Sequence, residues 1–350
     1  MVHADGMNLR LLVVGSAVAL TLTACSSSDG STEAAMPEPS KGASAELVEI
    51  SPLTGLALPN GRPDNPVFIV KIENTAGGAP QYALDQADMV MEELVEGGLT
   101  RLAAFYYSTL PAKVGHVRST RATDIGIASP VAGQLVASGG ASGTNARIRS
   151  AGITVFSEDD GAPGFSSDPA KVRPYNRLIN LQTVAAKAKV TTINGTYLEW
   201  TPSSSSAAEP TPTPTGSVAT SAKTATQATV RFSNSTATGW KLVDGKWQRT
   251  NGHAEAGHDL RAKTMIVMFC EVGDAGYTDP VGNPVPETKL EGTGRAMVFN
   301  GKTVTEVTWL KPSLDEPITF RGADDKPVTI DPGKVFFELV PKDGGSVNLG

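Results

Sequence analysis

Cysteine and histidine are both scarce in this chain, which limits the chemistry open to it. The 350 residues include two cysteines and four histidines, and no CxxC, HExxH or HxxEH pattern occurs. A zinc site needs three or four ligands at favourable spacing. His253 and His258, with Glu255 and Asp259, form only a loose H-x4-H-D group, which is more typical of a solvated loop. We therefore expect no bound metal and no cofactor.

Positive charge is also in deficit. Lys and Arg total 30 against 36 Asp and Glu, so the formal net charge is -6. A protein that binds nucleic acid through its phosphates needs an excess of positive charge, so we expect no nucleic-acid partner. The hydrophobic content of 40% and the charged content of 19% are ordinary for a globular protein.

Cys25 is the most informative single residue. It ends the run LTAC at 22–25, behind an apolar stretch at 11–22 that follows Arg10. A basic start, a short apolar core and small residues before a cleavage point are typical of a secretory signal peptide, and the stretch is too short to span a bilayer. Because the cleavage point precedes a cysteine, the pattern is a lipobox. We expect residues 1–24 to be removed and Cys25 to be lipidated.

Lipidation determines where the protein is expected to reside. Diacylglycerol on the cysteine sulfur and a further chain such as palmitate on the new amino terminus contribute roughly 0.8 kcal/mol per buried methylene. We therefore expect the protein on the extracytoplasmic face of the cell membrane, with the membrane as its partner through Cys25. Residues 25–46 are small and polar, which predicts a disordered tether.

The second cysteine, Cys270, is expected to be structural. It ends the apolar run TMIVMFC at 264–270, which is typical of a buried strand. With Cys25 lipidated, Cys270 has no partner for an internal disulfide. We interpret it as a core thiol rather than a nucleophile.

Changes in composition predict two folded domains after the tether. Residues 47–200 alternate strand-like and helix-like segments, which predicts an α/β (or α+β) N-terminal domain. Residues 201–227 are rich in Ser, Thr and Pro, which predicts a linker or an extended loop. Residues 228–350 contain short alternating segments separated by hairpin signals such as Asn-Gly at 300–301. This predicts a smaller, mainly-β C-terminal domain.

Within the N-terminal part, the Gly-Gly pair at 97–98 is the clearest turn signal, because glycine readily adopts positive dihedral angles. It predicts a hairpin between two of the expected strands. Strands are expected at 66–72, 89–95 and 99–108, and helices at 124–136 and 178–189.

The chain resembles the YerB-like family of bacterial lipoproteins, a domain-of-unknown-function family with an N-terminal and a C-terminal part. The main matches are QADMVMEELVEGGLTR at 86–101 and VGHVRSTR at 114–121. Weaker similarities are spread over most of the exported part, at 138–140, 174–176, 252–253 and 301–341. The resemblance implies a lipid-anchored envelope protein with two parts. It implies no reaction.

Charge is segregated between residues 85 and 124, where a group of carboxylates precedes a group of basic residues. Strand alternation places Glu92 and Glu96 on one face, and Glu93 on the other face with Met89 and Met91. A carboxylate on such an apolar face needs a partner, which an arginine can supply in bidentate fashion. The candidate ligand-binding residues are Asp88, Glu92, Glu93, Glu96, Arg101, Arg118, Ser119, Arg121 and Asn176.

Three functional hypotheses follow. The preferred one is a non-enzymatic binding or scaffold lipoprotein that recognises an anionic envelope polymer or an envelope protein through Arg101, Arg118 and Arg121. The alternative is a hydrolase or transferase acting on cell-wall polymer, with Glu92 or Glu93 as general acid or base. In the third, the same residues form a structural ion-pair network without a ligand site.

Overall fold

The computed structural model describes residues 49–202, 222–279 and 282–350. The predicted signal peptide, Cys25 and the tether lie outside these residues, as does most of the predicted linker. In the described ranges, no helix has both the length and the apolar character needed to cross a membrane.

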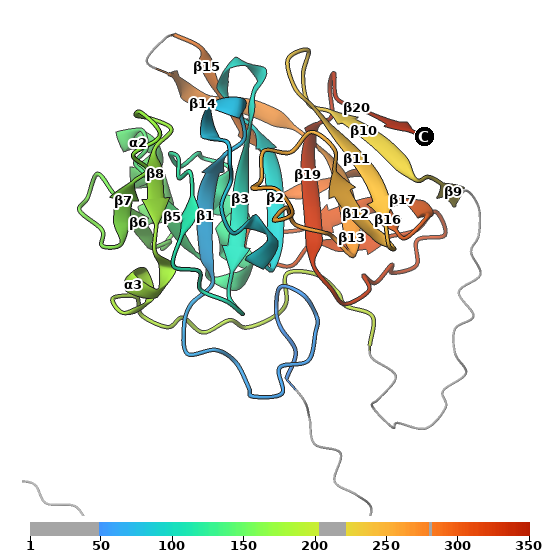
Figure 1. The fold of residues 1–350 in the computed structure, drawn as a ribbon. Helices are drawn as coiled ribbons and strands as arrows, with labels where there is room; N and C mark the ends of the chain where they lie inside the picture. The colour runs from blue at the N-terminus through green and yellow to red at the C-terminus, as the bar shows by residue number, and fades with distance from the viewer. Residues whose placement is uncertain (1–48, 203–221, 280–281) are drawn as a thin grey trace, which may run out of the picture. The chain divides into compact units, whose positions relative to one another are not determined.

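One eleven-stranded sheet forms the centre of the described structure (Figure 1). In spatial order its strands are β18 (Thr319–Arg321), β17 (Thr303–Lys311), β16 (Gly292–Asn300), β13 (Thr264–Cys270), β19 (Val335–Pro341), β2 (Met89–Leu94), β3 (Thr100–Tyr106), β1 (Phe68–Glu73), β5 (Gln134–Ala137) and β6 (Val155–Ser157), with β9 (Lys223–Thr224) paired to β17.

The two halves of the chain meet inside this sheet. β19, from the C-terminal part, pairs in parallel with β2 of the N-terminal part and with β13 on its other side. The mainly-β character of the C-terminal part is confirmed. The parts that the sequence separates as two domains therefore share one continuous sheet instead of forming two separate sheets.

Side chains alternate between two buried layers because successive residues of a strand point to opposite faces. In β1, Phe68 and Val70 contribute to one hydrophobic cluster, and Ile69 between them contributes to the other. A strand buried on both faces is apolar almost throughout, which is why β1 and β13 read as continuous hydrophobic runs.

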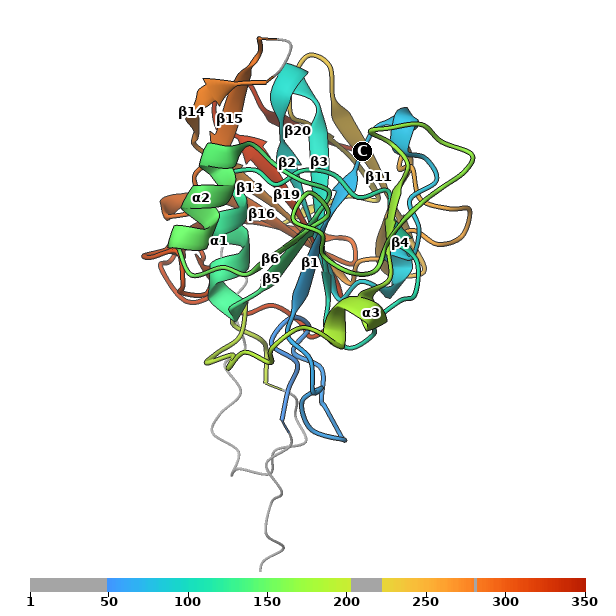
Figure 2. The same ribbon diagram turned by 90° about the vertical axis from the view of Figure 1, so that its left-hand side faces the viewer.

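Two of the three α-helices in the described residues cover one face of the sheet, which we call the helical face. α1 (Asp124–Ala128) and α2 (Ser142–Ser150) pack there through Ile127 and Ile148, in the same cluster as Ile69. Figure 2 shows both helices on one side of β1, β5 and β6.

Smaller sheets cover the opposite face, which we call the sheet face. Trp240 and Trp247 pack there from a four-stranded sheet, in the same cluster as Phe68. That sheet has the order β12 (Lys246–Arg249), β11 (Ala237–Val243), β10 (Gln227–Arg231), β20 (Ser346–Leu349). A second covering sheet has the order β4 (Val114–Gly115), β8 (Arg177–Ile179), β7 (Phe165–Ser167), and α3 (Leu181–Ala185) follows β8.

The remaining elements of the described ranges are a two-stranded ribbon of β14 (Val272–Thr278) and β15 (Pro284–Thr288), and four 3-10 turns. The turns are η1 (Ala76–Gly78), η2 (Leu84–Gln86), η3 (Glu96–Gly98) and η4 (Ser129–Val131). At η3 the predicted hairpin is present. Gly97 and Gly98 have φ of 70° and 71°, so each occupies the left-handed region that glycine tolerates best.

Both predicted helices are shorter than expected. The helix predicted at 124–136 ends at Ala128, and η4 with Pro130 near its start leads into β5. The prediction of a helix over 178–189 is wrong at its start, because Leu178 and Ile179 lie in β8. The Asn180 side chain accepts a hydrogen bond from the Thr183 amide at 3.1 Å and caps α3, which begins only at Leu181.

Candidate functional site

Five of the predicted charged residues lie together at one end of β1, β3 and β2 on the helical face, namely Glu93, Glu96, Arg101, Arg118 and Arg121. Glu73 lies opposite Arg101 on β3, and Arg101 lies opposite Glu93 on β2, so the three form a row across the sheet. Directly opposed residues share a face of the sheet. The row therefore places one guanidinium between two carboxylates.

A buried lysine, which the sequence did not single out, holds this row to α1. Lys71 Nζ donates to Glu93 Oε1 and, at 2.6 Å, to Asp124 Oδ1, and all three side chains are fully buried. Burial raises the pKa of Asp124 to about 6, against the opposing influence of Lys71. Lys71 explains how Glu93 can lie on the apolar face of β2, because a buried carboxylate needs a cation beside it.

The three predicted arginines are engaged within the protein. Arg118 pairs with Glu73, and Arg121 pairs with Glu96 at 2.7 Å. Arg101 donates to the Ser119 carbonyl at 3.2 Å. Burial and the neighbouring Arg121 and Arg118 together lower the pKa of Arg101 to about 9.

The charges of this end of the sheet balance. Lys71 and the three arginines face an equal number of carboxylates, namely Glu73, Glu93, Glu96 and Asp124. We call these eight residues the paired cluster. A set of charges that neutralise one another holds η3 and α1 against the sheet and leaves little net attraction for an external anion.

Other predicted residues have local structural roles. Asp88 Oδ2 accepts hydrogen bonds from the amides of Tyr107 and Ser108, at 2.7 and 2.9 Å, and so anchors the end of β3. The Asn176 carbonyl accepts from the Asp168 amide at 2.8 Å. Neither residue belongs to the paired cluster.

The remaining sulfur and histidine groups also have local surroundings. Cys270 is fully buried, and burial raises the pKa of its thiol to about 12, which keeps it protonated and unreactive at neutral pH. A hydrogen bond with Asp85 at 3.0 Å raises the pKa of His258, whereas burial lowers that of His253. In the parts of the chain that the structure describes, no three His, Cys, Asp or Glu side chains gather as metal ligands.

Glu92 lies on the sheet face, away from the paired cluster. Both of its carboxylate oxygens are within 3.0 Å of Thr238 Oγ1 of β11, and the Asn74 amide donates to Oε1 at 3.0 Å. Its partner in the register of β19 is Glu338. Glu92 and Glu93 therefore face opposite layers and cannot act together on one substrate.

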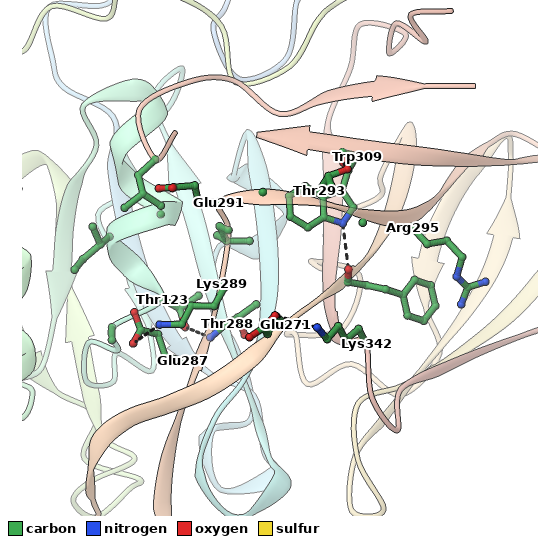
Figure 3. A pocket seen from close by; sticks show the side chains of 18 of the residues that line it. Thr123, Glu271, Glu287, Thr288, Lys289, Glu291, Thr293, Arg295, Trp309 and Lys342 are labelled. Carbon is green, nitrogen blue, oxygen red and sulfur yellow. Dashed lines mark hydrogen bonds and ion pairs between the residues drawn. The ribbon is translucent and has the colours of Figure 1, made fainter. Parts of the chain in front are cut away.

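A large groove opens between α1 and the C-terminal part, and the sequence did not point to it. Its volume is about 800 Å³. Figure 3 shows its side chains, which come from both halves of the chain. The lining residues include Thr123, Gly126 and Arg147 from the N-terminal half, and Phe269, Glu271, Glu287, Lys289, Glu291, Thr293, Gly294, Arg295, Trp309 and Lys342 from the C-terminal half.

The floor of the groove is apolar and closely packed. The Trp309 indole N–H donates to the Phe269 carbonyl at 3.1 Å, which fixes the ring against β13. A Cβ at Gly294 would approach the Trp309 ring to 2.7 Å and the Phe269 carbonyl to 2.8 Å. Glycine at this position lets the β16 backbone lie directly on the indole.

The rim carries four cations and three carboxylates. Arg147 donates to Glu287 through both terminal nitrogens, at 3.2 and 2.8 Å, and Lys289 pairs with the same carboxylate at 2.9 Å. Lys342 pairs with Glu271 at 2.9 Å. These cations lower the pKa of both glutamates, so both are ionised at neutral pH.

Arg295 is held differently from the other rim cations. Its guanidinium lies over the Phe269 ring, 3.8 Å from the centroid. The side chains that line the described groove thus carry a net charge of +1.

Sequence reasoning missed the groove because its residues come from separate segments. Residues 122–147 and 269–342 contribute to it, and none of the nine ligand-binding candidates lines it. The one local signal was the glycine-spaced GTG at 292–294 beside an arginine, which predicts close backbone approach but no ligand.

Comparison with known proteins places the chain among proteins of unknown function. Residues 53–194 match the family described as "Protein of unknown function (DUF3048) N-terminal domain", and residues 228–337 match the corresponding C-terminal domain. A curated relative, "Putative lipoprotein YerB" of Bacillus subtilis (strain 168), is 39% identical over 71 residues. That alignment covers 20% of this chain and 22% of the relative, so the chain matches about a fifth of its length.

A solved structure extends the likeness over most of the fold. The crystal structure of the YerB protein from Bacillus subtilis superimposes with a TM-score of 0.68, over 86% of this chain and 99% of that chain, at 19% sequence identity. At this identity the likeness concerns the fold alone. The resemblance inferred from residues 86–121 is confirmed.

Proposed function

The chain belongs to the DUF3048 family, and both domains of the family are matched. From this we propose that it is a lipid-anchored envelope protein that binds an anionic envelope ligand in the groove between its two family domains. The lipobox at Cys25 and the relative described as a lipoprotein support the anchor. The observation that carries the binding role is the groove itself, with its net positive rim and its tryptophan floor.

The position and chemistry of the groove support this role. Ligand sites form preferentially at domain junctions, in concave and largely apolar surfaces with a few charged groups. Here Trp309, Phe269 and Leu290 supply apolar surface, and Arg295 and Lys342 supply donors for a phosphate or carboxylate. The anion site thus lies in the groove and not in the paired cluster, whose charges neutralise one another.

Titration calorimetry with soluble anionic polymers tests the proposal. The probes are poly(glycerol phosphate) and polyglucuronate, added to the mature protein. Replacing both Arg295 and Lys342 by Ala removes two rim cations, and we expect at least a tenfold loss of affinity, since a hydrogen bond to a charged group contributes about 1.5–3 kcal/mol.

A matched control removes the same charge far from the groove. Arg261 and Lys326 pair with exposed carboxylates, and replacing both by Ala changes the net charge equally. If this control loses as much affinity as the groove variant, or if neither polymer binds, the groove is not the anion site. The absence of any binding partner would favour the purely structural role.

The alternative of a wall-polymer hydrolase or transferase using Glu92 or Glu93 is less well supported. The arginines proposed to hold the substrate surround Glu93, where Lys71 and Asp124 already occupy the buried space. Glu92 has no arginine of this set on its face of the sheet. Turnover of a wall polymer that disappears in both Glu→Gln variants would revive this alternative.

A further inference from the structure

Two glutamates meet on the sheet face where the halves of the chain join. Glu92 on β2 and Glu338 on β19 are partners in the parallel register, so their side chains lie side by side on one face. Both are fully buried. Like charges on adjacent strands of a sheet repel each other, and burial strengthens the repulsion.

The donors around the pair are distributed unequally. Glu92 accepts from Thr238 and from Asn74, at 3.0 Å in each case. Glu338 Oε1 accepts from the Trp240 indole N–H at 2.5 Å. No donor of the described residues reaches Glu338 Oε2, although that atom is buried. A bare carboxylate oxygen in such a position is costly, whereas a protonated one is itself a donor.

The charge that faces the pair does not compensate two carboxylates. From β12, Arg249 acts on both glutamates, but Asp259 accepts from it at 3.0 and 2.8 Å through both of its oxygens. The β11 groups packed against the pair, Trp240 and Thr238, are neutral. With both glutamates ionised, the group would carry two net negative charges in a buried layer.

We infer that Glu92 and Glu338 form a proton-binding site, in which one proton carried by Glu338 Oε2 is donated to the Glu92 carboxylate and ties β2 to β19. This inference is independent of the proposed groove. A cleft of about 280 Å³ is lined by Asn74, Asn251, His253 and Glu92, so the buried pair lies close to solvent. The proton therefore exchanges with the medium, and the seam between the two halves of the chain responds to external pH.

The direction of the response follows from proton linkage. Burial and the neighbouring Glu92 raise the pKa of Glu338 well above its ordinary value of 4.5. Folding then takes up a proton wherever the unfolded carboxyl is ionised and the folded one is not. The stabilisation from this proton is fully present below pH 4.5 and is lost as pH rises through the raised pKa of Glu338.

Urea unfolding at pH values from 4.5 to 9 tests the inference, because the pH slope of the unfolding free energy counts the protons exchanged. We expect the pH slope of the E338Q variant to correspond to up to one proton fewer than the wild-type slope, since Gln donates to Glu92 at every pH. The exposed Glu199 provides the control, E199Q, which should keep the wild-type slope. Equal slopes in wild type and E338Q would overturn the inference.

Infrared spectroscopy gives a second readout that does not depend on unfolding. A buried protonated carboxyl has a carbonyl stretching band that an ionised one lacks. We expect this band at neutral pH in wild type and in E92Q, where Glu338 keeps its proton, and its loss in E338Q. If wild type lacks the band at neutral pH, the glutamates do not share a proton. If E338Q does not fold, the wild-type and E92Q spectra still decide the question.

Discussion

Glu92 and Glu93 are neighbours in the sequence, yet they lie in opposite electrostatic surroundings. Glu93 points to the helical face, where Lys71 pairs with it and with Asp124. Glu92 points to the sheet face, where its strand partner is a second carboxyl, Glu338. Two identical residues on one strand therefore rely on different means of stabilisation: a cation in one case and a shared proton in the other. The neighbouring group, not the residue type, decides how each buried carboxyl is stabilised.

The largest expected effect comes from removing the lysine on the helical face. In a Lys71→Met variant, Glu93 and Asp124 remain buried without a cation, and we expect a loss of about 3–5 kcal/mol in the free energy of unfolding. Urea denaturation at pH 7 measures it. Adding Glu93→Gln to this variant should recover part of the loss. A variant as stable as wild type would show that the lysine does not compensate the carboxylates.

Exchanging each glutamate for glutamine compares the two faces directly. Glu93→Gln breaks the pair with Lys71, and we expect a loss of about 1–3 kcal/mol at pH 7. Glu92→Gln keeps an acceptor for Glu338 and removes the repulsion, so its stability should stay within about 1 kcal/mol of wild type or rise at alkaline pH. Chemical denaturation of the two variants in parallel measures the difference. A reversed order of stability would refute the comparison.

The helical face should also respond to pH, through Asp124. Its pKa is raised to about 6 in the folded protein from 3.8. Its contribution to stability is therefore fully present below about pH 3.8 and is lost as pH rises through about 6, on the order of 1–3 kcal/mol. An Asp124→Asn variant should have a flatter stability profile between these pH values. An unchanged slope would mean that Lys71 keeps Asp124 ionised throughout.

The smallest expected effect concerns the edge of the paired cluster. Arg121 pairs with Glu96 but keeps 12% of its side-chain surface exposed. A hydrogen-bonded pair that keeps some contact with solvent contributes less than a fully buried one, so Arg121→Ala should lower the unfolding free energy by about 1–2 kcal/mol. Thermal melting measures this change, and calorimetry with the anionic polymers should show unchanged affinity. Lost affinity together with unchanged stability would return the anion site to the arginines.

Local sequence patterns predicted much of the fold and part of the candidate site. The alternation of β2 correctly assigned Glu92 and Glu93 to opposite faces, because the period of a strand is two. The segregation of charge before and after Gly97-Gly98 predicted that carboxylates and arginines meet, and Arg121 with Glu96 is one result. Lys71 was not predicted as a site residue, because a single lysine within a β-branched run does not indicate which carboxylate it pairs with.

The longest-range features were beyond sequence reasoning. The groove forms because α1 lies beside β16 and the β14–β15 ribbon. The local periodicity of the sequence does not indicate that these elements are neighbours. The helix expected from Leu178 failed for a related reason, because pairing with β4 and β7 overrides the helical spacing of that segment.

The sequence by itself determined the hydrophobic alternation of the strands, the glycine hairpin, the mainly-β C-terminal part and the family resemblance, and it predicts the lipid anchor at Cys25. These depend on neighbouring residues, whose spacing is visible along the chain. Only the tertiary structure decided that β19 pairs with β2, that Lys71 neutralises Glu93 and that Glu338 lies beside Glu92. Such partners are far apart in the sequence, and the energy of a buried charge depends on which partner the fold brings to it.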